Sequence, residues 1–333
     1  MELPGTDFAG YRRMLASMIL IRAAEELIGD MVTLGSIKCP CHLAIGQEAP
    51  AVGVAEHMRA GDRLFGAHRS HAHYLALGGS VHGLMAEVQG KNTGASRGMG
   101  GSMHLIDTAH GLYGTVPIVG ATIPIAVGAG LAAKLDNKGG VAVSFFGDGA
   151  TEEGVFHESM NLAAILRAPV LFVCENNFFS SHLHVNLRQP ADSTCRYAEA
   201  HRVPWRRVDG NDVVAVAEAV GQFVAEMRNG GGPRYLEAVT YRWRGHVGPR
   251  EDEDVGVKRK DDLAIWKGRD PIRRLAEGLM LRQRLDDRAL AAMHADAKAK
   301  VAAAWEQASG DPYPPLEALM DHVYADGRKA AQP

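Results

Sequence analysis

The side chains best suited to chemistry lie in the middle of the chain, where an aspartate and an asparagine each follow an apolar run. The first run, 141–146, leads into Asp148, and the second, 170–174, leads into Asn177. The segment between them has helical character, so the sequence predicts a strand, a tight turn, a helix and a second, parallel strand. Because parallel strands bring their carboxyl ends to one edge of a sheet, we expect Asp148 and Asn177 to lie together there.

The carboxylate of Asp148 and the amide oxygen of Asn177 are hard ligands, which magnesium prefers when it also binds phosphates. Gly147 and Gly149 flank the aspartate and allow the backbone to approach a phosphate at the amino end of the next helix. The third glycine comes too late for the G-x-G-x-x-G turn of a dinucleotide-binding fold, and the further acids of an EF-hand loop are missing. The remaining alternative is an ordinary turn in which Asp148 caps the helix.

Taken together, these segments resemble the thiamine diphosphate motif, in which Gly-Asp-Gly is followed by Asn-Asn. The surrounding residues, from about 11 to about 275, resemble the alpha subunit of the thiamine diphosphate-dependent first component of 2-oxo acid dehydrogenase complexes. That family includes the pyruvate, branched-chain 2-oxo acid and acetoin enzymes. The resemblance implies a magnesium ion held by Asp148, Asn177 and the main-chain carbonyl of Phe179. It also implies a cofactor diphosphate in contact with Gly147, Gly149 and Ala150.

A basic run, His68-Arg69-Ser70-His71, is similar to the Tyr-Arg-x-His of the same family. The resemblance implies that Arg69 binds the cofactor diphosphate, for which a planar and always charged guanidinium is well suited. It further implies a cofactor contact at His68 and a catalytic role for His71. Position 68 departs from the family, which has tyrosine there. The alternative is a cluster of arginine and histidine on the surface.

Three other segments resemble parts of the family's cofactor pocket and substrate channel. The run Ile118-Val119-Gly120-Ala121 implies that Ile118 lies near the aminopyrimidine and that the main chain at Val119 contacts it. Pro117, just before it, stands where the family usually has glycine. The run 241–246 resembles Tyr-Arg-x-x-Gly-His and implies that His246 binds near the reactive ring and assists proton transfer or the acyl acceptor, work suited to imidazole. His42, in His-Leu-x-x-Gly-Gln-Glu-Ala, resembles the histidine that lines the substrate channel.

The alternatives for the last two residues are a loop histidine in solvent for His246 and a helix-start histidine without a catalytic task for His42. Val247 stands where many members of the family carry a regulatory serine, so this loop cannot be phosphorylated at that position. The departures at 68, 117 and 247 all fall near the expected mouth of the active site.

Composition excludes several other classes of protein. The chain has 333 residues and a formal net charge of −3, so a basic surface for nucleic acid is not expected. No run approaches the roughly 20 apolar residues of a membrane span, and the first residues resemble neither a signal nor a transit peptide. The four cysteines do not form a disulfide framework, and Cys39-Pro40-Cys41-His42 lacks the second ligand pair of a structural zinc site. These features predict a cytoplasmic protein.

The predicted fold class is α/β: the doubly wound, mostly parallel sheet of the thiamine diphosphate-binding fold, with helical extensions at both ends. We expect a single domain, 1–333, with N-terminal helices in 1–60 and a C-terminal helical extension in 262–333. Helices are predicted at 8–31, 46–58, 81–88, 119–135, 194–201, 213–227, 262–280 and 286–305. Further strands are predicted at 206–208 and 234–241. The segments 62–77 and 180–192 are predicted as loops, the first leading into a helix, and 242–260 as a long mobile loop.

One catalytic group is missing from the sequence. In the family, a glutamate on the aminopyrimidine activates the cofactor, and in two-subunit members it comes from the beta subunit. No glutamate of this chain suits the task, so the resemblance implies a beta partner, two alpha and two beta chains, and a small 2-oxo acid whose acyl group passes to a lipoylated acyltransferase. The alternative function is a carboligase or acyltransferase that uses the same cofactor to add a two-carbon unit to an aldehyde, ketone or sugar.

Overall fold

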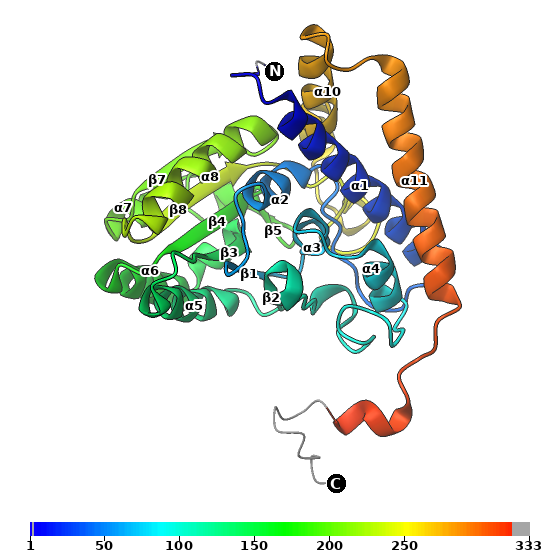
Figure 1. The fold of residues 1–333 in the computed structure, drawn as a ribbon, viewed down its shortest axis with the longest axis horizontal. Helices are drawn as coiled ribbons and strands as arrows, with labels where there is room; N and C mark the ends of the chain where they lie inside the picture. The colour runs from blue at the N-terminus through cyan, green and yellow to red at the C-terminus, as the bar shows by residue number, and fades with distance from the viewer. Residues whose placement is uncertain (2, 322–333) are drawn as a thin grey trace.

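A six-stranded, entirely parallel sheet forms the centre of the molecule, in the computed structural model that describes residues 1 and 3–321. The strand order is β2-β1-β3-β4-β8-β7 (Figure 1). The strands are β1 (Arg63–Gly66), β2 (Leu112–Thr115), β3 (Ala142–Gly147), β4 (Val170–Asn176), β7 (Trp205–Asp209) and β8 (Arg234–Val239). The predicted α/β class with a mostly parallel sheet is confirmed.

Two layers of helices cover the sheet, which explains why the central strands are largely apolar. Along β3, Val143 and Phe145 pack with α1 (Phe8–Thr33), α2 (Glu48–Ala55), α3 (His71–Ala76) and α8 (Val213–Arg228). Ala142 and Phe146 point to the other face and pack with α5 (Thr122–Asp136), α6 (Gly154–Leu166) and α7 (Cys195–Ala200). The strand therefore alternates between two cores, as the pleat requires.

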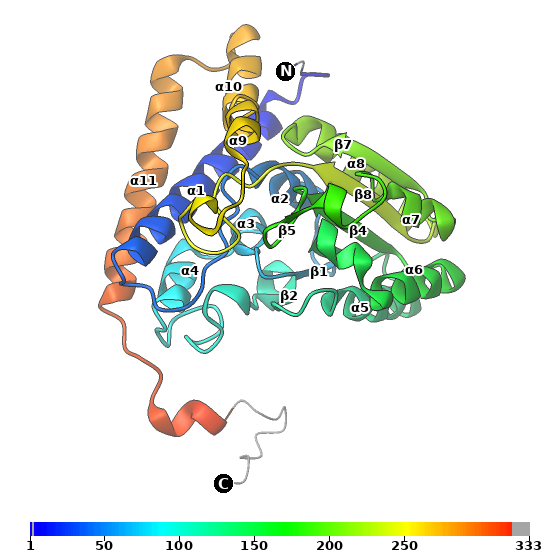
Figure 2. The same cartoon turned by 180° about the vertical axis from the view of Figure 1, so that it is seen from behind.

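The helices outside these layers gather along one side of the molecule. They are α4 (Val81–Val88), α9 (Lys260–Lys267), α10 (Pro271–Leu281) and α11 (Asp287–Ser309). Helix α11 runs alongside α1 and α4, and the view from behind shows α9 and α10 in line at its upper end (Figure 2). The predicted C-terminal extension is thus mainly helical as far as Ser309, and 322–333 lie outside the described residues. The division into one domain with two extensions stays a prediction.

Most predicted elements are present, but five segments differ. The predicted loop 62–77 contains strand β1, and the strand β2 was not predicted. The predicted loop 180–192 includes most of a short hairpin, β5 (Phe179–Ser180) with β6 (Leu183–His184). The predicted helix 262–280 is two helices, because Pro271 starts a new one at its first turn.

The fifth difference is the polar loop 242–260, which was predicted to be mobile because of its composition. Arg242 is fully buried and pairs with Asp252, with 2.7 Å between Nη1 and Oδ2. Arg259 is also buried, and its Nη2 donates to the carbonyls of residues 242, 243 and 244 at 2.9–3.0 Å. These internal bonds anchor the loop, so at least two of its charged side chains stabilise its structure. In the part of the chain that is described, no helix is both long and apolar enough to span a membrane.

Candidate active site

The carboxyl ends of four adjacent strands bring the predicted site residues together. His68 and Arg69 follow β1, Asp148 follows β3, Asn177 follows β4, and the loop after β8 carries His246. Since β1, β3, β4 and β8 are neighbours in the sheet, residues from distant parts of the chain meet at one edge. This is the edge at which open parallel sheets bind ligands.

A cavity of about 320 Å³ opens at this edge. Its volume is at the lower end of the range for small-molecule and cofactor sites. The lining includes eleven of the residues predicted for the site: His42, His68, Arg69, Val119, Gly147, Asp148, Gly149, Ala150, Asn177, Phe179 and His246. Two predicted residues, Ile118 and His71, are not in the lining. Ile118 is exposed on the turn before α5, and His71 is completely buried.

Asp148 begins the short 3₁₀ helix that follows β3 and is almost fully buried. Its Oδ2 pairs with the guanidinium of Arg188, which also contacts Glu152. Its Oδ1 has no hydrogen-bond partner among the described residues, and burial raises the pKa of the carboxyl above its usual value, although Arg188 opposes that shift. A buried, unpaired oxygen in a cavity wall is a position that a cation would satisfy.

Asn177 lies beside Asp148 in a tight turn after β4. Its side-chain Oδ1 accepts a hydrogen bond from the backbone N–H of Phe179 at 3.2 Å, and its Nδ2 donates to Gln47 at 3.3 Å. Phe178, between them, adopts a left-handed conformation with φ of +68°. That conformation turns the chain sharply, so that Asn177 and Phe179 both line the cavity.

Arg69 is a buried cation without a carboxylate partner among the described residues. Its Nη1 donates to the carbonyl of Leu43 at 2.6 Å, and its Nη2 donates to the carbonyl of His246 at 3.1 Å. Burial, and then the nearby charge of Arg242, lower its pKa to about 9. A desolvated guanidinium held by neutral acceptors favours an anion in the cavity.

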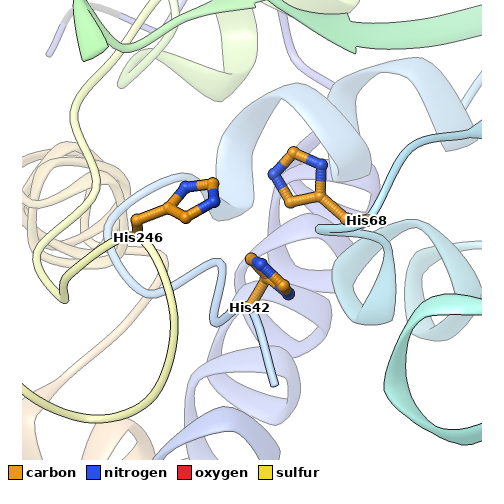
Figure 3. Close-up of side chains that lie close together, drawn as sticks. All are labelled: His42, His68 and His246. Carbon is orange, nitrogen blue, oxygen red and sulfur yellow. The ribbon is translucent and has the colours of Figure 1, made fainter. Parts of the chain in front are cut away.

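Three histidines face one another beside Arg69, as Figure 3 shows. The ring centroids of His42 lie 4.6 Å from His68 and 5.0 Å from His246, and the last two are 5.5 Å apart. Burial, followed by the charge of Arg69, lowers the pKa of His42 to about 3, of His68 to about 2 and of His246 to about 4. All three rings are therefore neutral at pH 7.

His71 occupies a different position from the other predicted histidines. In helix α3 its Nδ1 lies 3.0 Å from Glu25 and its Nε2 lies 2.8 Å from the hydroxyl of Ser102. The carboxylate of Glu25 also accepts the backbone N–H of Ala44 at 2.9 Å. His71 therefore links α1 to α3 and to the turn Gly101–Met103. Because Glu25 also holds Ala44, His71 can position the segment that carries His42 without touching a ligand.

Several lining residues were not predicted from the sequence. Gln47 has a buried Nε2 without a described partner, and Glu175 lies at the end of β4 with an oxygen 3.5 Å from His73. Both occur inside motifs that were recognised, so their positions were available in the sequence. Arg188, which pairs with Asp148, comes from a loop without a recognisable pattern, and only the folded chain brings it there.

Comparison with known proteins gives a consistent result. The family model described as "Dehydrogenase E1 component" matches residues 16–317. The chain is 36% identical over 317 residues to the alpha subunit of acetoin:2,6-dichlorophenolindophenol oxidoreductase from Bacillus subtilis, covering 95% of this chain and 94% of the relative. It is 34% identical over 318 residues to the pyruvate dehydrogenase E1 component subunit alpha of Rhizobium meliloti, with 95% and 89% covered. For the somatic mitochondrial form from Homo sapiens the identity is 33% over 316 residues, with 95% and 78% covered.

The His71–Glu25 contact predicts how stability depends on pH. The carboxylate raises the pKa of His71 in the folded chain above its usual 6.5, against the opposing effect of burial. The stability from this pair is therefore fully present below pH 6.5 and is lost as the pH rises through the folded-state pKa. We expect His71→Asn to cost about 3–5 kcal/mol at pH 6, the range for breaking a buried pair, and clearly less at pH 9.

Urea denaturation of wild type and His71→Asn at pH 6, 7.5 and 9 measures this difference. The variant Glu25→Gln serves as the matched control, because it should lose the same pH dependence from the other side of the pair. A stability difference that stays constant from pH 6 to pH 9 would contradict the ion pair.

Proposed function

The chain belongs to the family of dehydrogenase E1 components, and from that premise we propose that it acts as the alpha subunit of a thiamine diphosphate-dependent 2-oxo acid dehydrogenase. One observation carries the proposal: Asp148, Asn177 and Arg69 meet at the same cavity, at the carboxyl ends of parallel strands. A metal ligand pair and a free buried cation are the two things that a magnesium diphosphate requires.

The residues present fit the cofactor and its metal. Asp148 Oδ1 is buried without a described hydrogen-bond partner, so a magnesium ion there would replace a missing interaction. Asn177 and the main-chain carbonyl of Phe179 would complete the protein ligands. At Gly147 an added Cβ would meet open space, and at Gly149 it would lie 2.5 Å from the hydroxyl of Ser180. Gly149 thus allows the turn to pack against Ser180, and Gly147 leaves the backbone accessible to a phosphate.

We assign the remaining cofactor contacts to other residues that line the same cavity. Arg69, Gly147, Gly149 and Ala150 would hold the diphosphate, and His68 and Val119 would contact the cofactor. Ile118, which is outside the lining, keeps its proposed place near the aminopyrimidine only if the turn before α5 closes over the bound cofactor. His71, whose ring nitrogens both have partners, is proposed to position the His42 segment for catalysis rather than to contact the substrate.

The protein's part in the reaction is to bind, orient and move protons. When bound, thiamine diphosphate supplies the electron sink for loss of carbon dioxide from the 2-oxo acid. His246 and His42 are neutral at pH 7, so their unprotonated ring nitrogens can accept a proton or orient an acceptor group. The buried Nδ1 of His42 has no described hydrogen-bond partner, which leaves it available to a substrate.

The carboxylate that activates the aminopyrimidine is absent from the described cavity. Among its lining residues only Asp148 and Glu175 carry carboxylates. Glu175 lies opposite Gly147 in the register of β3 and β4, at the end of the site assigned to the diphosphate. A second chain must therefore supply the group, and the alpha-subunit relatives support a beta partner.

Exposed apolar side chains indicate where a partner would bind. Six of them lie on the turn before α5 and on α5 and α6: Ile118, Val119, Ile125, Leu135, Leu162 and Ile165. Exposed apolar groups that gather on neighbouring elements are typical of interfaces between proteins. We propose a heterotetramer of two alpha and two beta chains that passes the acyl group to a lipoylated acyltransferase. The comparisons do not favour the alternative, a carboligase acting on an aldehyde, ketone or sugar.

The test of the function is reconstitution. Because the activating carboxylate belongs to another chain, we expect the purified chain with thiamine diphosphate and magnesium to be inert toward pyruvate and other small 2-oxo acids. Adding its beta partner should restore decarboxylation, measured as carbon dioxide release. Full turnover by the chain alone would disprove the proposal that the active site is shared between this chain and a beta partner. Restored activity only with an aldehyde or sugar acceptor would favour the carboligase.

Removing the metal ligand should abolish binding of the cofactor and leave the fold intact. We expect Asp148→Ala to lose measurable affinity for thiamine diphosphate with magnesium in calorimetry, because the diphosphate charge is no longer neutralised. The control is Asp192→Ala, which removes a carboxylate that is 55% exposed on the loop before α7. Affinity like that of the wild type in Asp148→Ala would remove this residue from the metal site.

The role of His246 can be separated from cofactor binding. We expect His246→Ala to bind thiamine diphosphate nearly as well as the wild type, since Arg69 contacts only its main-chain carbonyl. Acyl transfer in the reconstituted enzyme should fall roughly 10²–10⁴-fold, the effect of losing a general acid–base group. His182→Ala is the matched control, because that ring is 6.0 Å from His246 and outside the cavity lining. Normal acyl transfer by His246→Ala would show that His246 has no catalytic role.

A further inference from the structure

We propose that His42, His68 and His246 together form a binding site for a divalent transition metal ion such as zinc, separate from the magnesium site at Asp148. Each histidine offers one ring nitrogen, and these three atoms all lie within 4.8 Å of one another. Three imidazoles with an open fourth position are a common ligand set for zinc. The metal site does not depend on the proposed function, because it rests on the histidines alone, whereas its expected effect on activity rests on that function.

The geometry needs only a small adjustment to bind an ion. In a tetrahedral site with zinc–nitrogen bonds of about 2.0–2.1 Å, the ligand nitrogens are roughly 3.4 Å apart. The rings already point toward one another from three sides, as Figure 3 shows. Rotations of the side chains that move the nitrogens inward by about an ångström would close the site around the ion. His68 and His246 are half-buried, so they have room for such rotations.

The chemical state of the rings also suits metal binding. A metal ion binds the unprotonated nitrogen, and its affinity falls wherever a proton must first leave. Burial, followed by Arg69, holds the pKa of all three rings well below 7, so no proton competes at neutral pH. In addition, the Nδ1 of His42 is buried without a described hydrogen-bond partner. The cluster therefore presents free lone pairs.

The surrounding charges limit the affinity. Arg69 and Arg242 both act on the cluster and oppose a second cation, while Asp252 near His246 partly offsets them. None of the three ligands is a carboxylate, so the ion would keep its full charge. We therefore expect zinc to bind reversibly, and not as a permanently bound structural metal.

Such an ion would act on the same groups that the reaction uses. The ligands come from the segment before α2, the end of β1 and the loop after β8, so the metal would tie three separate segments together. It would also occupy the lone pairs of His42 and His246. Zinc should therefore inhibit the enzyme reversibly, and a chelator should restore the activity. His68 supplies the third ligand, so we expect binding of the ion to require it.

The experiment uses the full-length chain without a polyhistidine tag. Zinc binding is measured by calorimetry in the absence of thiamine diphosphate, and cobalt(II) is added separately so that its visible absorption reports the ligand geometry. The wild type should bind one zinc ion per chain at this cluster. His68→Phe should weaken binding by more than the roughly 10–100-fold that losing even an outer partner of a metal ligand costs.

The matched control is His201→Ala. The Nε2 of His201 lies 3.4 Å from His157, and these two rings could bind zinc at the surface. No third ligand accompanies the pair among the described residues, and the substitution removes half of it. This variant should bind zinc and cobalt like the wild type. If instead His201→Ala removes the binding and His68→Phe keeps it, the site is at the surface pair and the proposal is wrong.

A second variant protects the test against misfolding. If the circular dichroism of His68→Phe differs from that of the wild type, His42→Ala takes its place with the same expected loss. Absence of zinc binding by the wild type would overturn the proposal directly. Because these measurements need neither cofactor nor partner, failure of the metal site and failure of the proposed function remain distinguishable.

Discussion

The buried guanidinium of Arg69 is the interaction on which the arrangement of the site depends. Its two hydrogen bonds to the carbonyls of Leu43 and His246 join three segments at the end of β1. No carboxylate pairs with it in the described chain, so its charge acts on the surroundings instead. That charge is the second cause, after burial, of the low pKa values of all three cavity histidines. One unpaired cation thus both holds the walls of the cavity together and adds to the effect of burial on the histidine pKa values.

Asp148 is also a buried charged group, but unlike Arg69 it has a partner of opposite charge. Its Oδ2 is paired with Arg188, and the pair leaves Oδ1 without a described partner in the wall of the cavity. A carboxylate held on one side by a guanidinium keeps a fixed orientation, so its other oxygen would be in place for the metal ion that we propose. The two arginines therefore differ: Arg188 is paired with a carboxylate, whereas Arg69 lines the cavity without a described carboxylate partner and would favour an anion there.

The sequence predicted what depends on local pattern and missed what depends on contacts. The long apolar runs of β3 and β4 and the helix at 81–88 were predictable, because their burial leaves a clear signature. Strand β1 has only four residues and was taken as part of a loop. The loop 242–260 looked mobile because burial of Arg242 and Arg259 cannot be inferred from composition. For the same reason Arg188 was not found, although the motif residues around Asp148 and Asn177 were.

The proton transfer proposed for His42 and His246 requires their environment to change during the reaction cycle. Rings with pKa values of about 3 and 4 are weak bases, and proton transfer is most efficient when the pKa is near the working pH. The effect of burial on these pKa values stays as long as the rings are buried, but an anion can neutralise the charge of Arg69. An anion bound to Arg69 would cancel part of the repulsion that disfavours the imidazolium form, so the pKa values of His42 and His246 would rise. If Arg69 binds the diphosphate as we propose, cofactor binding would therefore be linked to the basicity of His42 and His246.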